Sequence, residues 1–199
     1  MAHCLLLVRH GDTGPQYRGR FVGRTDVPLS ERGERQAATL ASVVHGLGTT
    51  RCFCSPLMRA VRTAGLACLK AVVWDDLREV DFGRWEGRTF EEVQAADPEL
   101  VARWAEWPAD FAFPGGERIG DFLARVRQAA DRMASDPAEV VAAVTHGGVI
   151  RAMVCHLLGL DARQYVLFNV EPASVTRVDL FDGKGVLAGL NDTCHLRAM

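Results

Sequence analysis

The chain has 199 residues, of which 48% are hydrophobic, and its formal net charge is −2 at pH 7. This length suits one globular unit with a sizeable core, so we expect a single domain over residues 1–199. The charge balance offers no general basic field for a nucleic acid, and apolar runs such as Cys4 to Val8 are far shorter than the roughly 18 residues of a membrane span, so neither a nucleic acid nor a membrane is expected as a partner.

Apolar runs of strand length alternate with stretches of helical periodicity, which is typical of an α/β domain with a largely parallel sheet. In chain order, the expected strands are residues 4–8, 51–54, 71–74, 140–144, 174–181 and 186–190. The last two flank Asp182-Gly183-Lys184-Gly185, and an Asp-Gly step favours the positive φ angles of a hairpin turn. We therefore expect a mostly parallel sheet with an antiparallel edge.

Two helices are expected after the first two strands. Ser30 is a suitable N-cap for the first, and its apolar residues at helical spacing are Ala37, Leu40, Ala41 and Val44, ahead of Gly46 and Gly48. Pro56 suits the first turn of the second helix, where its missing N–H costs nothing. The face of this second helix that packs on the sheet is predicted to hold Val61, Ala64 and Cys68.

Residues 77–120 differ from the rest of the chain. They hold three of the four tryptophans and several glycines, and their periodicity is interrupted. We interpret them as a small cap-like insertion beside the sheet and not as a separate domain. A third helix is expected around Phe122, Val126, Ala129, Ala130 and Met133, and a fourth from Val149 to Leu158, closed by Gly159.

Three polar clusters follow predicted strands. They are Arg9-His10-Gly11-Asp12-Thr13, the segment from Ser55 to Ala64 with Arg59 and Arg62, and Thr145-His146-Gly147-Gly148. In open α/β sheets, ligands usually bind at the carboxyl edge of the strands. Guanidinium groups match phosphate oxygens in bidentate geometry, and Gly11 and Gly148 let the backbone approach a ligand closely. If the strands are neighbours, a phosphoryl group is the ligand that suits this edge.

The sequence resembles the histidine phosphatase superfamily, also called the phosphoglycerate mutase-like family. The resemblance rests on Arg9-His10-Gly11, residues 19–23, 26–30 and 55–64, Leu77-Arg78-Glu79, residues 82–89, Pro114-Gly115-Gly116-Glu117 and residues 145–148, in that order. Residues 82–89 followed by 113–117 most resemble the α-ribazole phosphatase branch, which works in cobalamin assembly. The resemblance implies a three-layer α/β/α fold, with a mostly parallel sheet, an antiparallel edge and a small cap.

The resemblance also implies a double displacement without a metal or cofactor. His10 is the expected nucleophile, Arg9, Arg59 and His146 are expected to stabilise the phosphoryl oxygens, and Glu79 is expected to serve as acid and then as base. Because Glu79 must be protonated for the first step, we expect phosphoenzyme formation to be fastest at mildly acidic pH. The expected substrate-binding residues are Gly11, Thr13, Gln16, Arg20, Gly23 and Gly147.

Some positions depart from the family pattern. Gln16 stands where an asparagine commonly touches the phosphate, Asp12 where Glu or Gln is more usual, and Arg118 where Ser often follows the Pro-Gly-Gly-Glu motif. The longer side chain of Gln16 weakens the expectation of a phosphate contact. The five expected catalytic residues are unaffected.

Alternatives to this reaction stay open at the level of sequence. His10, His146 and Glu79 form a common set of metal ligands, although arginines in the same site would repel a divalent cation. A cofactor-dependent phosphoglycerate mutase, a broad-specificity sugar or nucleotide phosphatase and a non-catalytic phosphoanion-binding protein share the same core pattern. Glu86 is the rival to Glu79, and we interpret Glu86 as structural. Arg103 is the only basic residue in residues 93–112, the stretch in which a mutase would hold several basic residues for the second acidic group of its substrate. Hydrolysis is therefore favoured over mutase activity.

The cysteines and the N-terminal residues bear on the cellular compartment in which the protein is expected. The six cysteines contain no CxxC pair, which favours free thiols in a reducing environment. Charged Arg9 and Asp12 follow only a few apolar residues, so no secretion signal is expected. We therefore expect a cytoplasmic protein that acts on a small-molecule phosphate ester, with a homodimer as a possible assembly.

Overall fold

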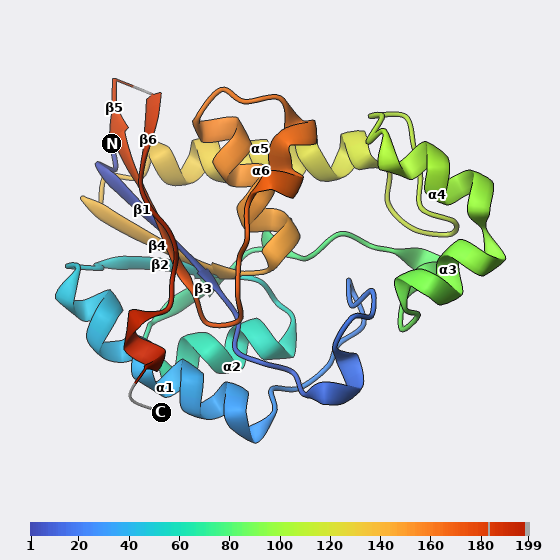
Figure 1. Ribbon diagram of the computed structural model, residues 1–199. Coiled ribbons are helices and arrows are strands. Elements are labelled where there is room, and N and C mark those ends of the chain that lie inside the picture. Colours follow the sequence, from blue (N-terminus) through green and yellow to red (C-terminus); the bar gives the residue numbers. More distant parts are fainter. Residues whose placement is uncertain (183, 198–199) are drawn as a thin grey trace.

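The computed structural model describes residues 1–182 and 184–197, and its centre is one six-stranded sheet with the order β3-β2-β4-β1-β5-β6 (Figure 1). The strands are β1 (Cys4–Arg9), β2 (Arg51–Cys54), β3 (Ala71–Val73), β4 (Val140–Thr145), β5 (Val175–Phe181) and β6 (Lys184–Asp192). The strands β3, β2, β4 and β1 run parallel, whereas β5 pairs antiparallel with β1 and with β6. The predicted strands and the antiparallel edge are confirmed.

Alternation along β1 divides the apolar side chains between two cores. Leu5 and Leu7 point into one cluster and Leu6 and Val8 into the other, and all four are 0% exposed. Side chains of a strand alternate between its faces, so a strand that is apolar throughout needs cover on both sides. This is why the chain forms three layers, as the resemblance implied.

Two pairs of helices provide this cover. Buried residues of α1 (Glu31–Gly46) and α2 (Met58–Leu66) belong to the cluster around Leu6, and those of α5 (Ile119–Ala134) and α6 (Gly147–Leu157) to the cluster around Leu5. Figure 1 shows the two pairs on opposite sides of the sheet. Ser30 caps α1 by accepting a hydrogen bond from the Gly33 N–H, as predicted.

Of the predicted apolar face of α2, only Ala64 is confirmed. Val61 is 42% exposed and Cys68 lies beyond the end of the helix, whereas Arg59, Ala60, Thr63 and Ala64 are the buried residues. The helix begins after Leu57, so Pro56 precedes it. The small residues Ala60 and Ala64 pack on the sheet, and the same face turns Arg59 inward toward the strand ends. Because this arginine is buried, the buried face of α2 is rotated by about one residue from the face that the spacing of apolar residues predicts.

The hairpin and the cysteines follow expectation where the structure describes them. β5 and β6 meet at the pair Phe181 and Lys184, and Asp182 has a φ of +48°. Gly183, the second residue of the predicted turn, lies outside the described residues. All six cysteines are free thiols. Within residues 1–182 and 184–197, no helix has the length and apolar character needed to cross a membrane.

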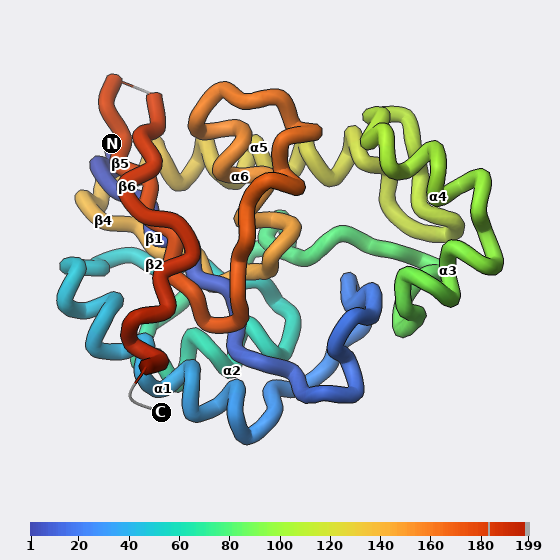
Figure 2. Tube along the Cα trace, in the orientation of Figure 1, coloured from blue at the N-terminus to red at the C-terminus, as the bar shows by residue number. Residues whose placement is uncertain are grey.

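The segment from residue 77 to residue 120 contains two helices, α3 (Phe90–Ala96) and α4 (Pro98–Ala105), besides irregular backbone. Thr89 and Glu92 form a capping box at the start of α3. Figure 2 shows both helices set apart from the sheet, on the side reached by the loop that follows β1. Phe21 of that loop packs against Trp85 and Trp104, with ring centroids 5.8 and 5.7 Å apart. The segment is therefore tied to the strand-end loops through aromatic contacts.

Short 3₁₀ helices complete the chain. They are η1 (Pro15–Tyr17), η2 (Asp75–Leu77), η3 (Gly83–Trp85), η4 (Ala162–Leu167) and η5 (Cys194–Leu196). Tyr165 of η4 stacks on Trp107, with ring centroids 4.2 Å apart and an interplanar angle of 24°. This contact joins the connection after α6 to the 77–120 segment.

Candidate active site

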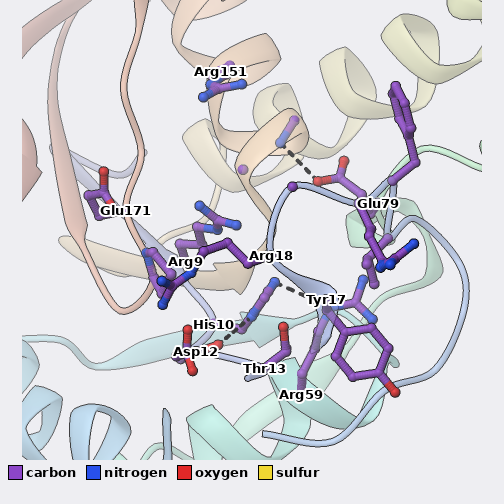
Figure 3. A pocket seen from close by; sticks show the side chains of 18 of the residues that line it. Arg9, His10, Asp12, Thr13, Tyr17, Arg18, Arg59, Glu79, Arg151 and Glu171 are labelled. Carbon is purple, nitrogen blue, oxygen red and sulfur yellow. Dashed lines mark hydrogen bonds between the residues drawn. The ribbon is translucent and has the colours of Figure 1, made fainter. Parts of the chain in front are cut away.

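The three predicted polar clusters meet at one edge of the sheet. His10 directly follows β1, Ser55 follows β2 and His146 follows β4, and these strands are parallel neighbours. A cavity of about 890 Å³ opens there, and Arg9, His10, Arg59 and Glu79 line it (Figure 3). The carboxyl edge of the parallel strands is thus the site of convergence, as the sequence predicted.

The hydrogen bonds of His10 define its tautomer. Its Nδ1 lies 2.8 Å from the carbonyl oxygen of Gly11, which can only accept, so Nδ1 carries the proton. Its Nε2 accepts a hydrogen bond of 3.3 Å from Nε of Arg59, which can only donate. The lone pair of the neutral ring is therefore on Nε2, next to a guanidinium group. Nε2 is the atom of His10 that is available as a nucleophile.

Both histidines are held neutral by their surroundings. Burial, followed by the charges of Arg59 and Arg9, places the pKa of His10 well below its usual range. Burial and the same two guanidinium groups, with His10 itself, also lower the pKa of His146. Burial and nearby positive charge both disfavour the imidazolium form. Arg9 and Arg59 thus lie where they disfavour a proton on His10, as expected from the sequence.

His146 lies beside His10, with ring centroids 5.1 Å apart in an edge-to-face arrangement. Its Nε2 is 2.8 Å from Oγ of Ser55, and it is 0% exposed. In the described part of the chain, its buried Nδ1 has no hydrogen-bond partner. Buried polar atoms without partners are uncommon in folded proteins and mark places where a ligand or water completes the bonding.

Arg59 is almost entirely buried, at 1% exposure. Its two terminal nitrogens donate to the carbonyl oxygens of Thr25, at 2.9 Å, and Gly23, at 2.7 Å. The loop that carries these carbonyls is held in turn by the carboxylate of Glu86, which accepts from the backbone N–H groups of residues 23, 24 and 25. Glu86 thus holds the loop whose carbonyl oxygens bind Arg59. These contacts agree with the interpretation of Glu86 as a structural residue.

Arg9 leaves part of its bonding capacity open. One terminal nitrogen donates to the carbonyl oxygen of Val170 at 2.5 Å, but its Nε is buried and, among the residues described, unpartnered. A Cβ placed on Gly147, at the start of α6, would lie 3.6 Å from Nε and Cζ of Arg9. The guanidinium therefore faces the N-terminal end of α6, where helix N–H groups favour an anion.

Glu79 is positioned by backbone groups. Its Oε2 accepts from the Gly148 N–H at 2.9 Å and its Oε1 from the Val80 N–H at 3.1 Å. The preceding loop is fixed by Arg125, which donates to the carbonyl oxygens of residues 76, 78 and 79 and is paired with Glu117 at 2.7 Å. Glu79 as a whole residue is 8% exposed and lines the cavity. It is therefore held in place while remaining accessible to a ligand.

The six expected substrate-binding residues are not all brought together. Gly11, Thr13, Arg20 and Gly147 line the cavity, but Gln16 and Gly23 do not. Gln16 is exposed and donates from its amide to the Thr13 carbonyl oxygen at 3.4 Å. Gly23 contributes its carbonyl oxygen to Arg59 instead, and a Cβ at this position would collide with Val80 and Glu86.

Several residues of the site were missed by the sequence interpretation. Arg125 and Thr63 hold functional segments, the latter by accepting from the Gly11 N–H at 3.1 Å and donating to the Arg59 carbonyl oxygen at 2.7 Å. Arg151 and Tyr165 also line the cavity. The position of Arg151 four residues after Gly147, on one face of the same helix, was the available sequence signal.

The metal alternative requires the two imidazoles and Glu79 to share one ion. Instead, a guanidinium group occupies the lone-pair side of His10, and Nε2 of His146 is bonded to Ser55. No group of three or more His, Cys, Asp or Glu side chains with metal-ligand geometry occurs in the portion of the chain described. The arrangement of cations suits an anion at this position.

Comparisons with known proteins agree with this geometry. The model of the histidine phosphatase superfamily (branch 1) matches residues 5–193. Phosphoserine phosphatase 1 of Hydrogenobacter thermophilus is 34% identical over 197 residues, covering 96% of this chain and 93% of that protein. The adenosylcobalamin/alpha-ribazole phosphatase of Salmonella typhimurium is 31% identical over 192 residues, covering 94% of this chain and 95% of that protein.

A solved structure with the same fold is that of mycobacterial glucosyl-3-phosphoglycerate phosphatase in complex with VO3. It has a TM-score of 0.84 and 31% sequence identity, and the match covers 96% of this chain and all of that one. The relatives thus include α-ribazole phosphatases, as the resemblance implied. They also include phosphoserine phosphatases, which the sequence interpretation did not name.

Proposed function

The chain belongs to the histidine phosphatase superfamily and is a phosphoric monoester hydrolase, and from this premise we propose that it transfers the phosphoryl group of its substrate to Nε2 of His10. The observation that carries the proposal is the bonding of His10, which lines the cavity: its Nδ1–H donates to the Gly11 carbonyl oxygen, and its unprotonated Nε2 accepts from Nε of Arg59. A histidine held in this tautomer is ready to attack an electrophile without losing a proton first.

In the first step, Nε2 of His10 bonds to phosphorus while the ester P–O bond breaks, and Glu79 gives a proton to the leaving alkoxide. In the second step, Glu79 takes a proton from a water molecule whose oxygen attacks the phosphohistidine, which releases inorganic phosphate and restores His10. One carboxyl group serves both steps, because it ends the first step deprotonated. We expect the first step to be fastest at mildly acidic pH.

The charge of the transferred phosphoryl group is proposed to be stabilised by Arg9, Arg59 and His146. The buried Nε of Arg9 and Nδ1 of His146 have no acceptor or donor within the described residues. Phosphate oxygens would accept from Arg9 and would replace Nε2 of His10 as the acceptor for Arg59. Positioned charges and hydrogen-bond donors of this kind contribute most of the catalysis in phosphoryl transfer.

Trapping of the intermediate tests this proposal. After rapid mixing with a radiolabelled phosphomonoester, the wild-type chain should carry label that is stable in base and lost in acid. His10→Ala should carry none, whereas His45→Asn, which changes an exposed histidine of α1, should be labelled like wild type. Label on His10→Ala, or a base-labile acyl phosphate on the wild type, would refute the assignment of the nucleophile.

The substrate is a small phosphate ester, and we propose two candidate classes. One is α-ribazole 5′-phosphate, from the resemblance of residues 82–89 and 113–117. The other is phosphoserine or a related phosphorylated acid, supported by the 34% identity to phosphoserine phosphatase 1. Release of inorganic phosphate from a panel of both classes ranks them, and 2,3-bisphosphoglycerate-dependent isomerisation of phosphoglycerate would reveal a mutase activity.

Two expectations from the sequence, about cellular location and about assembly, stay predictions. One is a cytoplasmic location, which cell fractionation can test. The other is a homodimer, which light scattering on the purified protein can test. Neither is needed for the proposed reaction, because the five proposed catalytic residues come from one chain.

A further inference from the structure

The cavity extends beyond the place proposed for the phosphoryl group. Its lining includes seven arginines, Arg9, Arg18, Arg20, Arg32, Arg59, Arg151 and Arg197, but three carboxylates, Asp12, Glu79 and Glu171. Bound phosphate would bring at most two negative charges, so the cavity would stay cationic. Fixed cations in a cleft favour ligands with further negative charge.

Four of these arginines, Arg18, Arg32, Arg151 and Arg197, have no side-chain hydrogen bond or ion pair among the described residues, but the other three are exposed and Arg151 is not. It is half-buried, its Nε is inaccessible to solvent, and among the described residues its side chain has neither a hydrogen bond nor an ion pair. By contrast, Arg20 is paired with Glu92 and donates to the Gly87 carbonyl oxygen. A partly desolvated guanidinium without a partner is costly unless a ligand supplies an acceptor.

The position of Arg151 relates it to the phosphoryl site. Gly147 and Arg151 are four residues apart on α6 and both line the cavity, so they share a face of the helix. Gly147 adjoins Arg9 at the phosphoryl end. Four residues of α-helix rise about 6 Å, so the backbone that carries Arg151 is one turn beyond that end. Figure 3 shows the Arg151 side chain on this helix, apart from His10 and Arg59.

One aromatic side chain of the cavity wall, Tyr165, lies near Arg151. Tyr165, which stacks on Trp107, also lines the cavity, and burial raises its pKa to about 12, with the charges of Arg151 and Glu79 acting on it. Tyr165 is therefore a neutral hydroxyl near the guanidinium. The three carboxylates of the cavity have other contacts: Asp12 with Ser30 and Gly14, Glu79 with backbone N–H groups, and Glu171 with Asn169.

Resting on the proposed function, we propose that Arg151 forms a second anion subsite, which selects phosphomonoesters that carry a carboxylate two or three bonds from the ester oxygen. A single guanidinium fork matches a planar carboxylate in bidentate geometry. The rise of one helical turn fits the separation of the two acidic groups in a small phosphorylated hydroxy acid or amino acid. Arg151 is thus a specificity-determining residue, and the α-ribazole phosphate class lacks the group that it binds.

A matched pair of substrates tests the subsite in the wild-type chain. Phosphoethanolamine is phosphoserine without its carboxylate, so the ratio of their kcat/KM values isolates that group. We expect phosphoserine to be favoured by roughly 10- to 100-fold, the effect of one charge-assisted hydrogen-bonded pair. A ratio of one or less, or a higher kcat/KM for α-ribazole 5′-phosphate than for phosphoserine, would overturn the subsite.

Variants assign the preference to Arg151. Arg151→Gln should reduce the ratio roughly 10-fold or more, mainly through KM for phosphoserine, while phosphoethanolamine changes less than about threefold. Arg151→Lys should restore part of the ratio, because it keeps the charge but not the fork. Arg127→Gln, which removes an exposed charge of α5 outside the cavity, should leave the ratio unchanged. Equal loss on both substrates in both Arg151 variants would refute the assignment.

The outcome also separates this inference from the reaction mechanism. Phosphohistidine trapped from p-nitrophenyl phosphate, together with no preference for a carboxylate, would refute the subsite alone. No phosphohistidine from any ester of the panel would refute the proposed function, and the subsite with it.

Discussion

Gly148→Ala is expected to displace the proposed acid without unfolding the protein. A Cβ on residue 148 would lie 2.5 Å from Oε1, 3.1 Å from Cδ and 3.2 Å from Oε2 of Glu79. Ordinary contacts begin at 3.4 Å, so the nearest oxygen must retreat by about 0.9 Å, the difference between 3.4 and 2.5 Å. The carboxylate is the free end of a side chain and can move, but it then loses the 2.9 Å hydrogen bond from the Gly148 N–H.

The expected magnitudes follow from this movement. A misplacement of about 1 Å in a reacting group costs on the order of 100-fold in rate. The free energy of unfolding should change by less than about 1 kcal/mol, because the lost hydrogen bond and the gain from replacing a helical glycine with alanine are of similar size. Gly148→Ala should therefore be a folded protein that reacts on the order of 100-fold more slowly with an alkyl ester.

The assay compares two leaving groups. An alkyl phosphate needs a proton on its leaving oxygen, whereas p-nitrophenyl phosphate does not. Single-turnover formation of phosphohistidine in Gly148→Ala should fall by about 100-fold with the alkyl ester and far less with the aryl ester. Equal rates for wild type and variant with the alkyl ester would refute the placement of Glu79 as the acid. So would an equal loss with both esters.

Two controls separate displacement from general damage. Gly65→Ala adds a methyl group to helix α2 at a place where none of the described residues has an atom in contact with it, so activity should be unchanged. Glu79→Asp shortens the acid, and the double variant with Gly148→Ala should be no slower than the slower single variant. Coupling of this kind shows that the two changes act on the same group.

Further predictions concern pH and the supports of the site. Because the pKa values of His10 and His146 are lowered by folding, the unfolded chain binds protons below pH 6.5 that the folded chain does not. The free energy of unfolding, measured in urea, should then decrease as the pH is lowered below 6.5, by about 1.4 kcal/mol per pH unit for each of the two histidines. His10→Asn should remove about half of that slope. A free energy of unfolding that stays constant from pH 7 to 5 would contradict this prediction. Arg125→Met should cost about 3 kcal/mol in the same measurement, because it removes the 2.7 Å partner of Glu117 and leaves that carboxylate, among the described residues, only the more exposed Arg24 as an ion-pair partner at 3.5 Å; adding Glu117→Gln should recover part of the loss, and an unchanged midpoint would show that the pair is not structural. Glu86→Gln should lower stability by about 1–3 kcal/mol, since it removes acceptors from backbone N–H groups, and activity lost at full stability would instead identify Glu86 as the acid.

The fold could be predicted largely from local pattern. The strand runs are short, apolar and bounded by polar or turn residues, so their limits agree with β1 to β6 within about two residues at nearly every end. Helix α2 was the exception, because Arg59 is charged and yet buried. Apolar spacing cannot identify a face on which a functional guanidinium replaces an apolar side chain. The same residue, however, was expected in the site from its motif.

The supports of the site could not be predicted in the same way. Glu79 bonds to Gly148, which is 69 residues away, and Arg125 bonds to the Glu79 loop across 46 residues. Such contacts depend on how α5 and α6 are seated against one face of the sheet. Before the chain is folded, Arg125 and Arg151 are two ordinary arginines at helical positions.

The sequence by itself determined that His10, Arg59 and His146 meet at one sheet edge, because continuous apolar runs end just before each polar cluster and parallel strands align those ends. The tertiary structure alone decided which nitrogen of His10 carries the lone pair, that Glu79 and not Glu86 lines the cavity, and that Arg151 has no partner among the residues the structure describes. The physical reason is one of range. Periodicity and strand ends are local properties of the chain, whereas the bonding of a buried polar group depends on neighbours that only the packed layers bring within 3 Å or so of it.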